Sequence, residues 1–203
     1  MIKYVLPALV LGVLAGYLNN NFGFPKLNVF FSEYIFNISL FLLLFLMGML
    51  FGVDEKATAR MKAAGFKVLV FPLAVALGSI LGGFVGGLVL GINLFASMGV
   101  CAGYGWYTLA GPLAGQLFGL RWGAIGFAVN FLRELVTIAT GWLAAKLDKY
   151  APIAMGGATA MDTTLPIIVR YSGQDTLITA FSSGFILTMA APFTITAIAA
   201  IAH

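Results

Sequence analysis

The sequence predicts an all-α membrane protein that crosses the bilayer several times. Of its 203 residues, 61 % are hydrophobic and only 9 % are charged, whereas a soluble domain carries about 25 % charge. The mean hydropathy is +1.02. Apolar runs also recur at the length of about 20 residues that a helix needs to cross a membrane. We therefore expect residues 1–203 to form one transmembrane domain.

Seven apolar segments fit helices that cross the membrane, and the fourth and sixth are interrupted. They are Lys3–Leu18, Val29–Val53, Phe66–Leu90, Ile92–Phe118, Gly123–Leu147, Ala151–Val169 and Thr176–Ala202. The first resembles a signal peptide in length, but three asparagines follow it in place of a small-residue cleavage site, so we expect it to be retained. The second is centred on the solid apolar run Leu40–Leu46. The third begins as the charge-dense loop 54–67 ends, and the fifth and seventh are continuous.

The distribution of basic residues predicts the orientation, because Lys and Arg are enriched in cytoplasmic loops. Placing loop 54–67 in the cytoplasm puts seven of them inside: Lys3, Lys56, Arg60, Lys62, Lys67, Arg121 and Arg170. It leaves three outside: Lys26, Lys146 and Lys149. We therefore expect a multi-pass protein of the cell membrane with a cytoplasmic N-terminus and an external C-terminus. One re-entrant segment would invert the C-terminal part.

Glycine pairs at four-residue spacing recur along these segments. They include Gly12/Gly16, Gly48/Gly52, Gly78/Gly82, Gly83/Gly87 and Gly111/Gly115. Such pairs let helix backbones approach closely. Tight packing within one chain is the first interpretation. A dimer face is the alternative, with Gly82–Gly83 and Gly86–Gly87 as its candidate.

Both interrupted segments carry a glycine nine residues before a proline, in Gly103–Pro112 and in Gly157–Pro166. Thr108 and Asp162 hold the same place, four residues before the proline. Proline removes a backbone donor and glycine adopts conformations that other residues avoid, so we expect unwound stretches near the midplane of the membrane. A simple kink is the alternative for each. Paired interruptions of this kind indicate the binding site of a transporter.

The directions of the two interrupted segments raise a difficulty. One crossing separates them, so both are expected to run the same way through the membrane. An inverted repeat within the chain requires opposite directions. Either one segment is re-entrant, or a symmetry mate supplies the inverse copy.

Three ionisable residues fall at membrane depth, where each costs about 2.5–3.5 kcal/mol. These are Arg133, Glu134 and Asp162. Helical spacing places four residues on one polar face: Asn130, Glu134, Thr137 and Gly141. Arg133 lies about 100° around the helix from Glu134, so we expect it to meet another helix, with Asp162 as the obvious partner. The alternative is a static ion pair that only orients helices.

The acids suggest distinct roles. A buried carboxylate exchanges protons more readily near neutral pH, so Glu134 is a candidate proton carrier. Asp162 is a candidate ligand for a cationic group, and Tyr104, Trp106 and Tyr107 are candidates for cation–π contacts. Ordinary aromatic packing is the alternative for the three rings.

Other chemistry finds little support in the sequence. Ser182-Ser183-Gly184 lacks a base, since the only histidine is the terminal His203, so no hydrolase is expected. No metal motif, phosphate loop or nucleotide fingerprint is present, and we expect neither an enzyme nor a cofactor. The lone Cys101 excludes a disulfide scaffold. The net charge of +4 without a dense basic block argues against nucleic-acid binding.

Four motifs, in order along the chain, resemble those of the LysO lysine exporter family. The run Gly103-Tyr-Gly-Trp-Tyr-Thr-Leu-Ala-Gly111 is similar to its G-[FY]-G-W-Y-[ST]-L-x-G signature, and Arg133-Glu134-Leu135 to its intramembrane R-E-L. Gly157–Pro166 resembles its G-A-T-x-M-D-x-T-L-P, and Gly184–Leu187 its G-F-I-L. The similarity begins near Phe41 and continues to the C-terminus.

The resemblance implies export of L-lysine and its analogues across the inner membrane in exchange for protons, with Glu134 as the essential acid. Longer relatives carry an extra N-terminal membrane region, so a homodimer or a small membrane partner is expected here. We expect Asp162 or Glu134 to hold an ammonium, and Arg133 or a half-helix N-terminus to hold the carboxylate. The full candidate substrate set is Asp162, Arg133, Asn130, Thr108, Trp106, Tyr107 and Thr163.

Two other classes of function stay open at this point. A passive channel or facilitator for small cations or cationic amino acids needs a continuous wet pore and no proton coupling. A membrane scaffold or membrane enzyme would use the charges as a structural ion pair.

Overall fold

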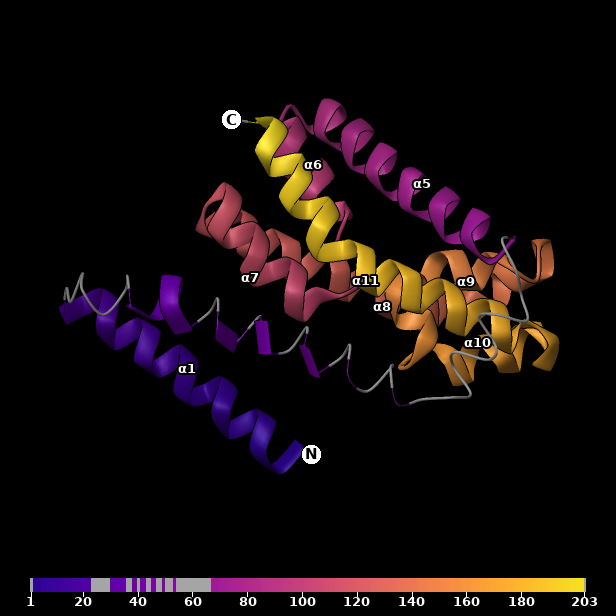
Figure 1. Ribbon diagram of the computed structural model, residues 1–203, viewed down its shortest axis with the longest axis horizontal. Helices are drawn as coiled ribbons and strands as arrows, with labels where there is room; N and C mark the ends of the chain where they lie inside the picture. The colour runs from indigo at the N-terminus through magenta and orange to yellow at the C-terminus, as the bar shows by residue number, and fades with distance from the viewer. Residues whose placement is uncertain are drawn as a thin grey trace. The chain divides into compact units, whose positions relative to one another are not determined.

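The computed structural model describes residues 2–22, 30–35 and 67–202, with a few single or paired positions between 38 and 53. The chain divides into two compact units, 1–53 and 54–203. In the first unit, the helix α1 (Ile2–Phe22) covers the first expected crossing, and a π-helix occupies Phe30–Ile35 (Figure 1). Most of the second expected crossing, Val29–Val53, and the loop 54–66 lie outside the described residues. The single domain over 1–203 stays a prediction.

Three long helices form the frame of the second unit: α5 (Lys67–Leu90), α8 (Leu120–Leu147) and α11 (Leu177–Ala202). Among the described residues, these contain the three helical stretches that are long and apolar enough to cross a membrane. Large apolar side chains on α5 lie exposed four residues apart, as on a lipid-facing surface: Leu73, Leu77 and Leu81. The third, fifth and seventh expected crossings therefore correspond to helices.

The helix α8 runs antiparallel to α5 and α11. The rings of Phe71, near the start of α5, and Tyr150, just after α8, lie 6.2 Å apart between centroids. The middles of the same two helices meet where Arg133 bonds Ser79 at 2.9 Å. α11 begins beside the end of α8, because Asp175 pairs with Lys149. Within the frame, α5 and α11 therefore run the same way and pack on each other, and α8 runs the other way.

The fourth expected crossing folds into a hairpin of two short helices, α6 (Leu94–Cys101) and α7 (Tyr107–Phe118), joined by turns at 102–106. α6 packs on the C-terminal half of α5, where a Cβ atom on Gly83 would lie 2.7 Å from the Ser97 carbonyl oxygen. α7 packs on the N-terminal half of α8, where a Cβ atom on Gly115 would lie 3.3 Å from the Gly123 Cα. Residues 94–118, the first hairpin, therefore begin beside the end of α5 and finish beside the start of α8, which lie at one level because the two helices are antiparallel.

The sixth expected crossing reverses in the same way. It comprises α9 (Ala151–Gly156), a 3₁₀-helix (Gly157–Met161), turns at 162–164 and α10 (Leu165–Ser172). A Cβ atom on Gly141 of α8 would lie 3.8 Å from Pro152, where α9 begins, and 3.5 Å from Tyr171, where α10 ends. Residues 151–172, the second hairpin, therefore also begin and end at one level of α8.

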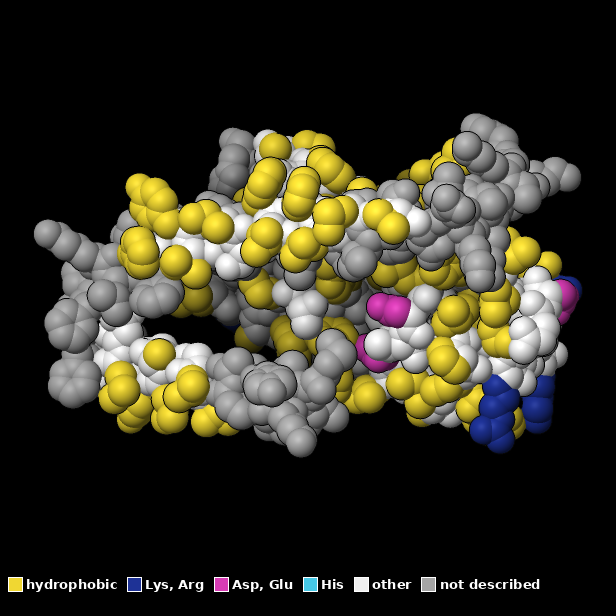
Figure 2. All heavy atoms as spheres, turned by 60° about the horizontal axis from the view of Figure 1, so that its bottom comes forward, with side chains coloured by type: hydrophobic (Ala, Val, Ile, Leu, Met, Phe, Trp, Pro, Cys, Tyr) yellow, Lys and Arg dark blue, Asp and Glu magenta, His cyan; other side chains and the backbone are white. Residues whose placement is uncertain are grey.

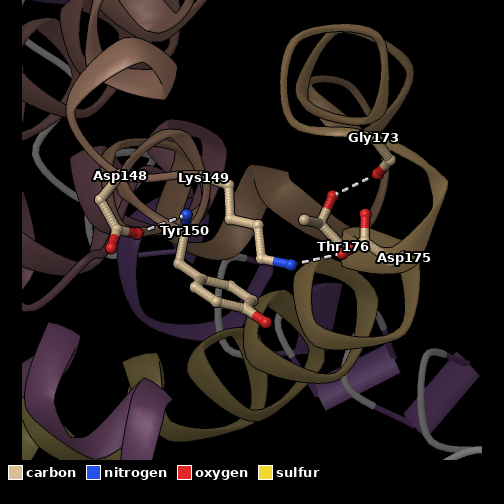
Figure 3. A network of polar contacts seen from close by, with 6 residues as sticks. All are labelled: Asp148, Lys149, Tyr150, Gly173, Asp175 and Thr176. Carbon is tan, nitrogen blue, oxygen red and sulfur yellow. Dashed lines mark hydrogen bonds and ion pairs between the residues drawn. The ribbon is translucent and has the colours of Figure 1, made fainter.

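An ion pair closes the base of the second hairpin. Lys149 precedes α9 and Asp175 follows α10, and Figure 3 shows the Lys149 ammonium reaching the Asp175 carboxylate. The Thr176 hydroxyl donates to the Gly173 carbonyl oxygen at 2.7 Å on the same side of the base. Lys149 and Asp175, the two feet of this hairpin where it leaves α8 and joins α11, are therefore held together.

The described residues do not confirm that both interrupted segments pass through the membrane. α6 and α7 have 8 and 12 residues, which at about 1.5 Å per residue makes each shorter than a bilayer core. In Figure 1 the first hairpin lies toward one end of the second unit and α9 and α10 toward the other. The hairpins therefore enter from opposite ends of α8. They have the opposed directions of an inverted repeat, which two complete crossings separated by one helix could not have. Their depth in a membrane stays a prediction.

The glycine pairs divide between packed and open positions. Gly83 and Gly87 pack against α6, and Gly111 and Gly115 pack against α8. Close packing within the chain is thus confirmed for these four. Three glycines on another side of α5 would meet nothing within 4 Å: Gly78, Gly82 and Gly86. The proposed dimer face loses Gly83 and Gly87 to internal packing, and its remaining residues are untested.

Candidate functional site

The tips of the two hairpins meet beside the middle of α8. The first tip comprises residues 102–106 and the second tip residues 157–164. The Ala158 N–H donates to the Tyr104 carbonyl oxygen at 2.8 Å. A Cβ atom added to Gly157 would overlap this carbonyl oxygen, and Gly157 has φ +61°. Glycine is therefore required at this point for the tips to touch.

The first tip contains a strained residue. Tyr104 has φ +53°, a conformation that non-glycine residues rarely adopt, and its side chain is fully buried. Such strain costs about 1–3 kcal/mol and persists only where surrounding contacts hold it. Because its ring is buried, Tyr104 is not placed to receive a ligand in this structure. The strain marks the first tip as a held, specific conformation.

Asn130 of α8 holds the first tip. Its Oδ1 accepts from the Gly105 N–H at 2.7 Å, and its Nδ2 donates to the carbonyl oxygens of Val100 at 2.9 Å and Gly126 at 2.8 Å. Both amide hydrogens are therefore used within the protein. Asn130, which the sequence suggested as a substrate ligand, therefore holds the first tip in this structure.

Arg133 holds the start of the second tip. Its guanidinium donates to the carbonyl oxygens of Ala154 and Met155 at 2.8 Å each, at the C-terminal end of α9, and to the Ser79 hydroxyl at 2.9 Å. A cation at a helix C-terminus is favourable because the last carbonyl groups carry partial negative charge. The expected ion pair with Asp162 is therefore wrong: backbone carbonyls supply the negative end. Sequence reasoning missed Ser79, because a single serine in an apolar helix carries no distinguishing signal.

Glu134 differs from its neighbour. Its side chain is only 8 % exposed, and its Oε2 has no hydrogen-bond partner among the described residues. The predicted polar face is confirmed, since α8 buries Gly126, Asn130, Glu134, Thr137 and Gly141. An unpartnered buried carboxylate oxygen is expensive, and in native proteins it indicates a missing water, proton or ligand.

Asp162 and Thr163 lie exposed in the second tip. The Asp162 Oδ1 accepts from the Thr163 N–H at 2.6 Å. Behind them the Thr159 hydroxyl donates to the Gly156 carbonyl oxygen at 2.9 Å and lies 3.2 Å from the Thr164 hydroxyl. These two buried threonines brace the tip, and the sequence reasoning missed them.

The aromatic candidates stand at the start of α7. Trp106 is the N-terminal cap residue of α7 and supplies no side-chain hydrogen bond to it, and Thr108 is exposed. The Tyr107 ring packs edge-on to Phe127 and Phe131, at 5.3 and 5.4 Å between centroids. Its phenol lies within electrostatic range of both Glu134 and Asp162. Tyr107 therefore lies in the neighbourhood of both acids that the sequence singled out.

Charged side chains are sparse in the rest of the described part of the chain. On the face drawn in Figure 2, basic side chains gather at one end, while acidic side chains also appear apart from them among apolar ones. At the exposed base of the second hairpin, the hydrogen bond to Asp175 raises the pKa of Lys149 above its ordinary value. That pair is remote from the tips and has no part in the candidate site.

Comparisons with known proteins show which proteins this chain is similar to. The chain is 30 % identical over 164 residues to the lysine exporter LysO of Escherichia coli, covering 81 % of this chain and 53 % of that protein. It is 31 % identical over 91 residues to a proposed lysine exporter of Haemophilus influenzae, covering 45 % and 47 %. The chain thus spans about half the length of the curated relatives it matches. No solved structure matches it.

A family model extends the similarity along nearly the whole chain. It matches residues 6–199 and is described as the lysine exporter LysO. The match includes both hairpins and the α8 residues between them. The chain belongs to the LysO lysine exporter family.

Proposed function

We propose that this chain exports L-lysine across the cell membrane in exchange for protons. Family membership supports the substrate class, since one relative is named a lysine exporter. The observation that carries the mechanism is the buried, unpartnered Oε2 of Glu134 beside two hairpin tips. Half-helices that end at one point are the arrangement that membrane transporters use to bind charged solutes.

Lysine fits the charges around this point. It carries two ammonium groups and one carboxylate. Glu134 and Asp162 supply two carboxylates within electrostatic range of Tyr107, and we propose that each receives one ammonium. The proposed site is completed by Trp106 in the first tip, Thr108 at the start of α7 and Thr163 in the second tip.

The carboxylate of lysine needs donors other than Arg133, whose guanidinium is engaged by Ser79 and by the end of α9. The N-terminus of α7, begun by Tyr107 and without a side-chain cap, offers a dipole that is favourable for an anion. We therefore assign the carboxylate to α7 and remove Arg133 from the direct ligands. Asn130 is likewise a support of the first tip.

Glu134 would alternate between a proton and the substrate. When it is ionised it attracts an ammonium, and when it is protonated it releases one. The exchange couples lysine leaving the cell to protons entering it, because one buried carboxylate cannot bind both at once. Partial burial of the site by both hairpins makes this competition strong.

The basic residues at the two ends of α8 also predict the orientation of the chain in the membrane. Lys146, Lys149 and Arg170 lie toward the end of α8 where α5 begins, and Arg121 lies at the other end. We propose that the more basic end faces the cytoplasm. The end of α11 then lies outside, as the sequence predicts, whereas Lys146, Lys149 and Arg121 change sides relative to that prediction. A homodimer or a small membrane partner completes the proposed transport unit.

The test is radiolabelled lysine flux in proteoliposomes that contain only the purified full chain, with and without an imposed pH gradient. Flux that follows the gradient supports exchange. Flux that ignores the gradient means a passive facilitator. Absence of flux from folded protein overturns self-sufficient lysine transport. Asp162→Asn should raise the lysine concentration for half-maximal flux about tenfold, the cost of one charge-assisted bond.

A further inference from the structure

The two hairpins repeat each other at a fixed distance along the chain. Gly103 and Gly157 lie 54 residues apart, as do the prolines Pro112 and Pro166. The same shift relates the glycines that end the hairpins. Gly119 has φ +101° and ψ 159°, and Gly173 has φ +96° and ψ 159°. The repeat is therefore present in backbone conformation as well as in sequence.

Residues that the shift makes equivalent touch each other. Ser79 and Arg133 lie 54 residues apart and share a hydrogen bond of 2.9 Å. Tyr104 and Ala158 are also 54 apart and share a hydrogen bond of 2.8 Å. A residue contacts its own equivalent at a two-fold axis. Since the hairpins enter from opposite ends of α8, the arrangement is an inverted repeat, with its axis through the meeting tips.

The helix that follows each hairpin obeys the same relation. Asn130 of α8 and Gly184 of α11 lie 54 residues apart. Asn130 bonds Gly105 in the first tip, and a Cβ atom on Gly184 would lie 2.8 Å from the Ala158 carbonyl oxygen in the second. Each equivalent position therefore faces the tip of the hairpin that precedes it.

The helix α8 donates hydrogen bonds to equivalent carbonyl oxygens in the two hairpins. The carbonyl oxygens of Val100 and Ala154, 54 residues apart, lie at the C-terminal ends of α6 and α9. Asn130 donates to the first at 2.9 Å, and Arg133 donates to the second at 2.8 Å. The two donors are three residues apart on α8, which places them on neighbouring faces of one turn.

We propose that Asn130 and Arg133 are positioning residues that act as two separate latches, one for each hairpin. Asn130 holds the first hairpin on α8 and Arg133 holds the second. When one latch is released, the tip that it holds can move toward the end of α8 from which that hairpin enters. The other hairpin stays docked. This inference rests on the proposed function for its purpose, because a transporter must open to one side at a time.

The repeat supplies a matched pair of probes. Cys101, the only cysteine in the sequence, ends α6 beside the first tip. Its equivalent under the shift is Met155, near the end of α9. The first reporter is the native thiol, and the second is Met155→Cys in a Cys101→Ala background. The rate of labelling by a water-soluble maleimide is measured on the full chain in proteoliposomes, without lysine or a pH gradient.

Each latch variant should expose one reporter. Asn130→Asp keeps the acceptor for Gly105 and loses both amide donors, so labelling at Cys101 should rise about tenfold, the factor for one lost buried hydrogen bond. Labelling at the second reporter should not change. Arg133→Gln should give the reverse pattern. Arg133→Lys keeps the positive charge and should restore most of the protection at the second reporter.

The crossed pattern separates latches from general loosening. A rise at both reporters in either variant, or at neither, overturns the proposal. Ser79→Ala removes only the bond to α5, leaves the bonds from Arg133 to Ala154 and Met155, and covers the case in which Arg133→Gln fails to fold. An unchanged rate at the second reporter supports a latch between Arg133 and α9, and a rise of about tenfold there overturns it, because the bond to α5 would then hold the hairpin. Labelling needs no transport, so failure of lysine flux would leave these outcomes readable.

Discussion

Arg133 and Glu134 are adjacent on α8, yet their side chains have opposite surroundings. The Arg133 guanidinium donates to Ala154, Met155 and Ser79, whereas the Glu134 Oε2 has no partner among the described residues. A base that is saturated by the protein supports structure, and an acid that is left unsatisfied is available for chemistry. This contrast distinguishes the surroundings of two neighbouring charged residues.

Glu134→Gln should abolish the dependence of lysine flux on the pH gradient. The amide keeps the shape of the side chain but neither carries a proton across nor attracts an ammonium as a charge. We expect gradient-driven flux to fall by about a hundredfold, within the range lost when a proton-transfer group is removed. The control is Asp148→Asn, an exposed acid after α8. Gradient-dependent flux that survives in Glu134→Gln would rule out Glu134 as the proton carrier.

Gly157→Ala should destabilise the second unit. The added methyl would overlap the Tyr104 carbonyl oxygen, a rigid backbone atom, and the residue has φ +61°. We expect a loss of about 2–4 kcal/mol, typical of overpacking at a constrained backbone position. Thermal unfolding in detergent measures the change. Gly82→Ala is the matched control, since nothing lies within 4 Å of its added methyl. Equal midpoints for the two variants would mean that the tips do not touch as described.

Both feet of the second hairpin should be reachable from one side of the membrane. In a Cys101→Ala background, Lys149→Cys and Asp175→Cys should label with the same impermeant reagent added to the same side. The reason is that Lys149 and Asp175 pair at the base of this hairpin. Arg121→Cys, at the other end of α8, should label from the opposite side. Labelling of the two feet from opposite sides would mean that residues 151–172 cross the membrane.

The ion pair at that base should contribute a small stabilisation that disappears at high pH. The hydrogen bond to Asp175 raises the pKa of Lys149 above 10.5. A raised pKa in the folded state means that the contribution is complete below the unfolded value and is lost as the pH rises through the folded value. Lys149→Met should therefore lower the unfolding midpoint slightly at pH 8 and leave it unchanged at a pH above the folded pKa. A difference that is constant across this window would exclude the ion pair as its cause.

The sequence was sufficient for the elements whose signal is local. Apolar length predicted the helices that became α5, α8 and α11, because a membrane-length run of apolar residues has no other stable form. Helical spacing placed Asn130, Glu134 and Gly141 on one face of α8, and the structure buries that face. The glycine and proline motifs also marked where the two hairpins break. These features depend on residues within a few turns of one another.

The features that the sequence left undecided depend on contacts between distant segments. A broken helix continues or reverses according to what it packs against, and residues such as Gly83, Gly115 and Gly141 decide this through neighbours far along the chain. In the same way, Arg133 met the carbonyl end of α9 rather than Asp162. The spacing along α8 predicted the direction in which Arg133 points. It did not predict the backbone carbonyl groups that the second hairpin brings to the guanidinium. Packing between the repeats therefore set both the topology and the partners of the charged residues.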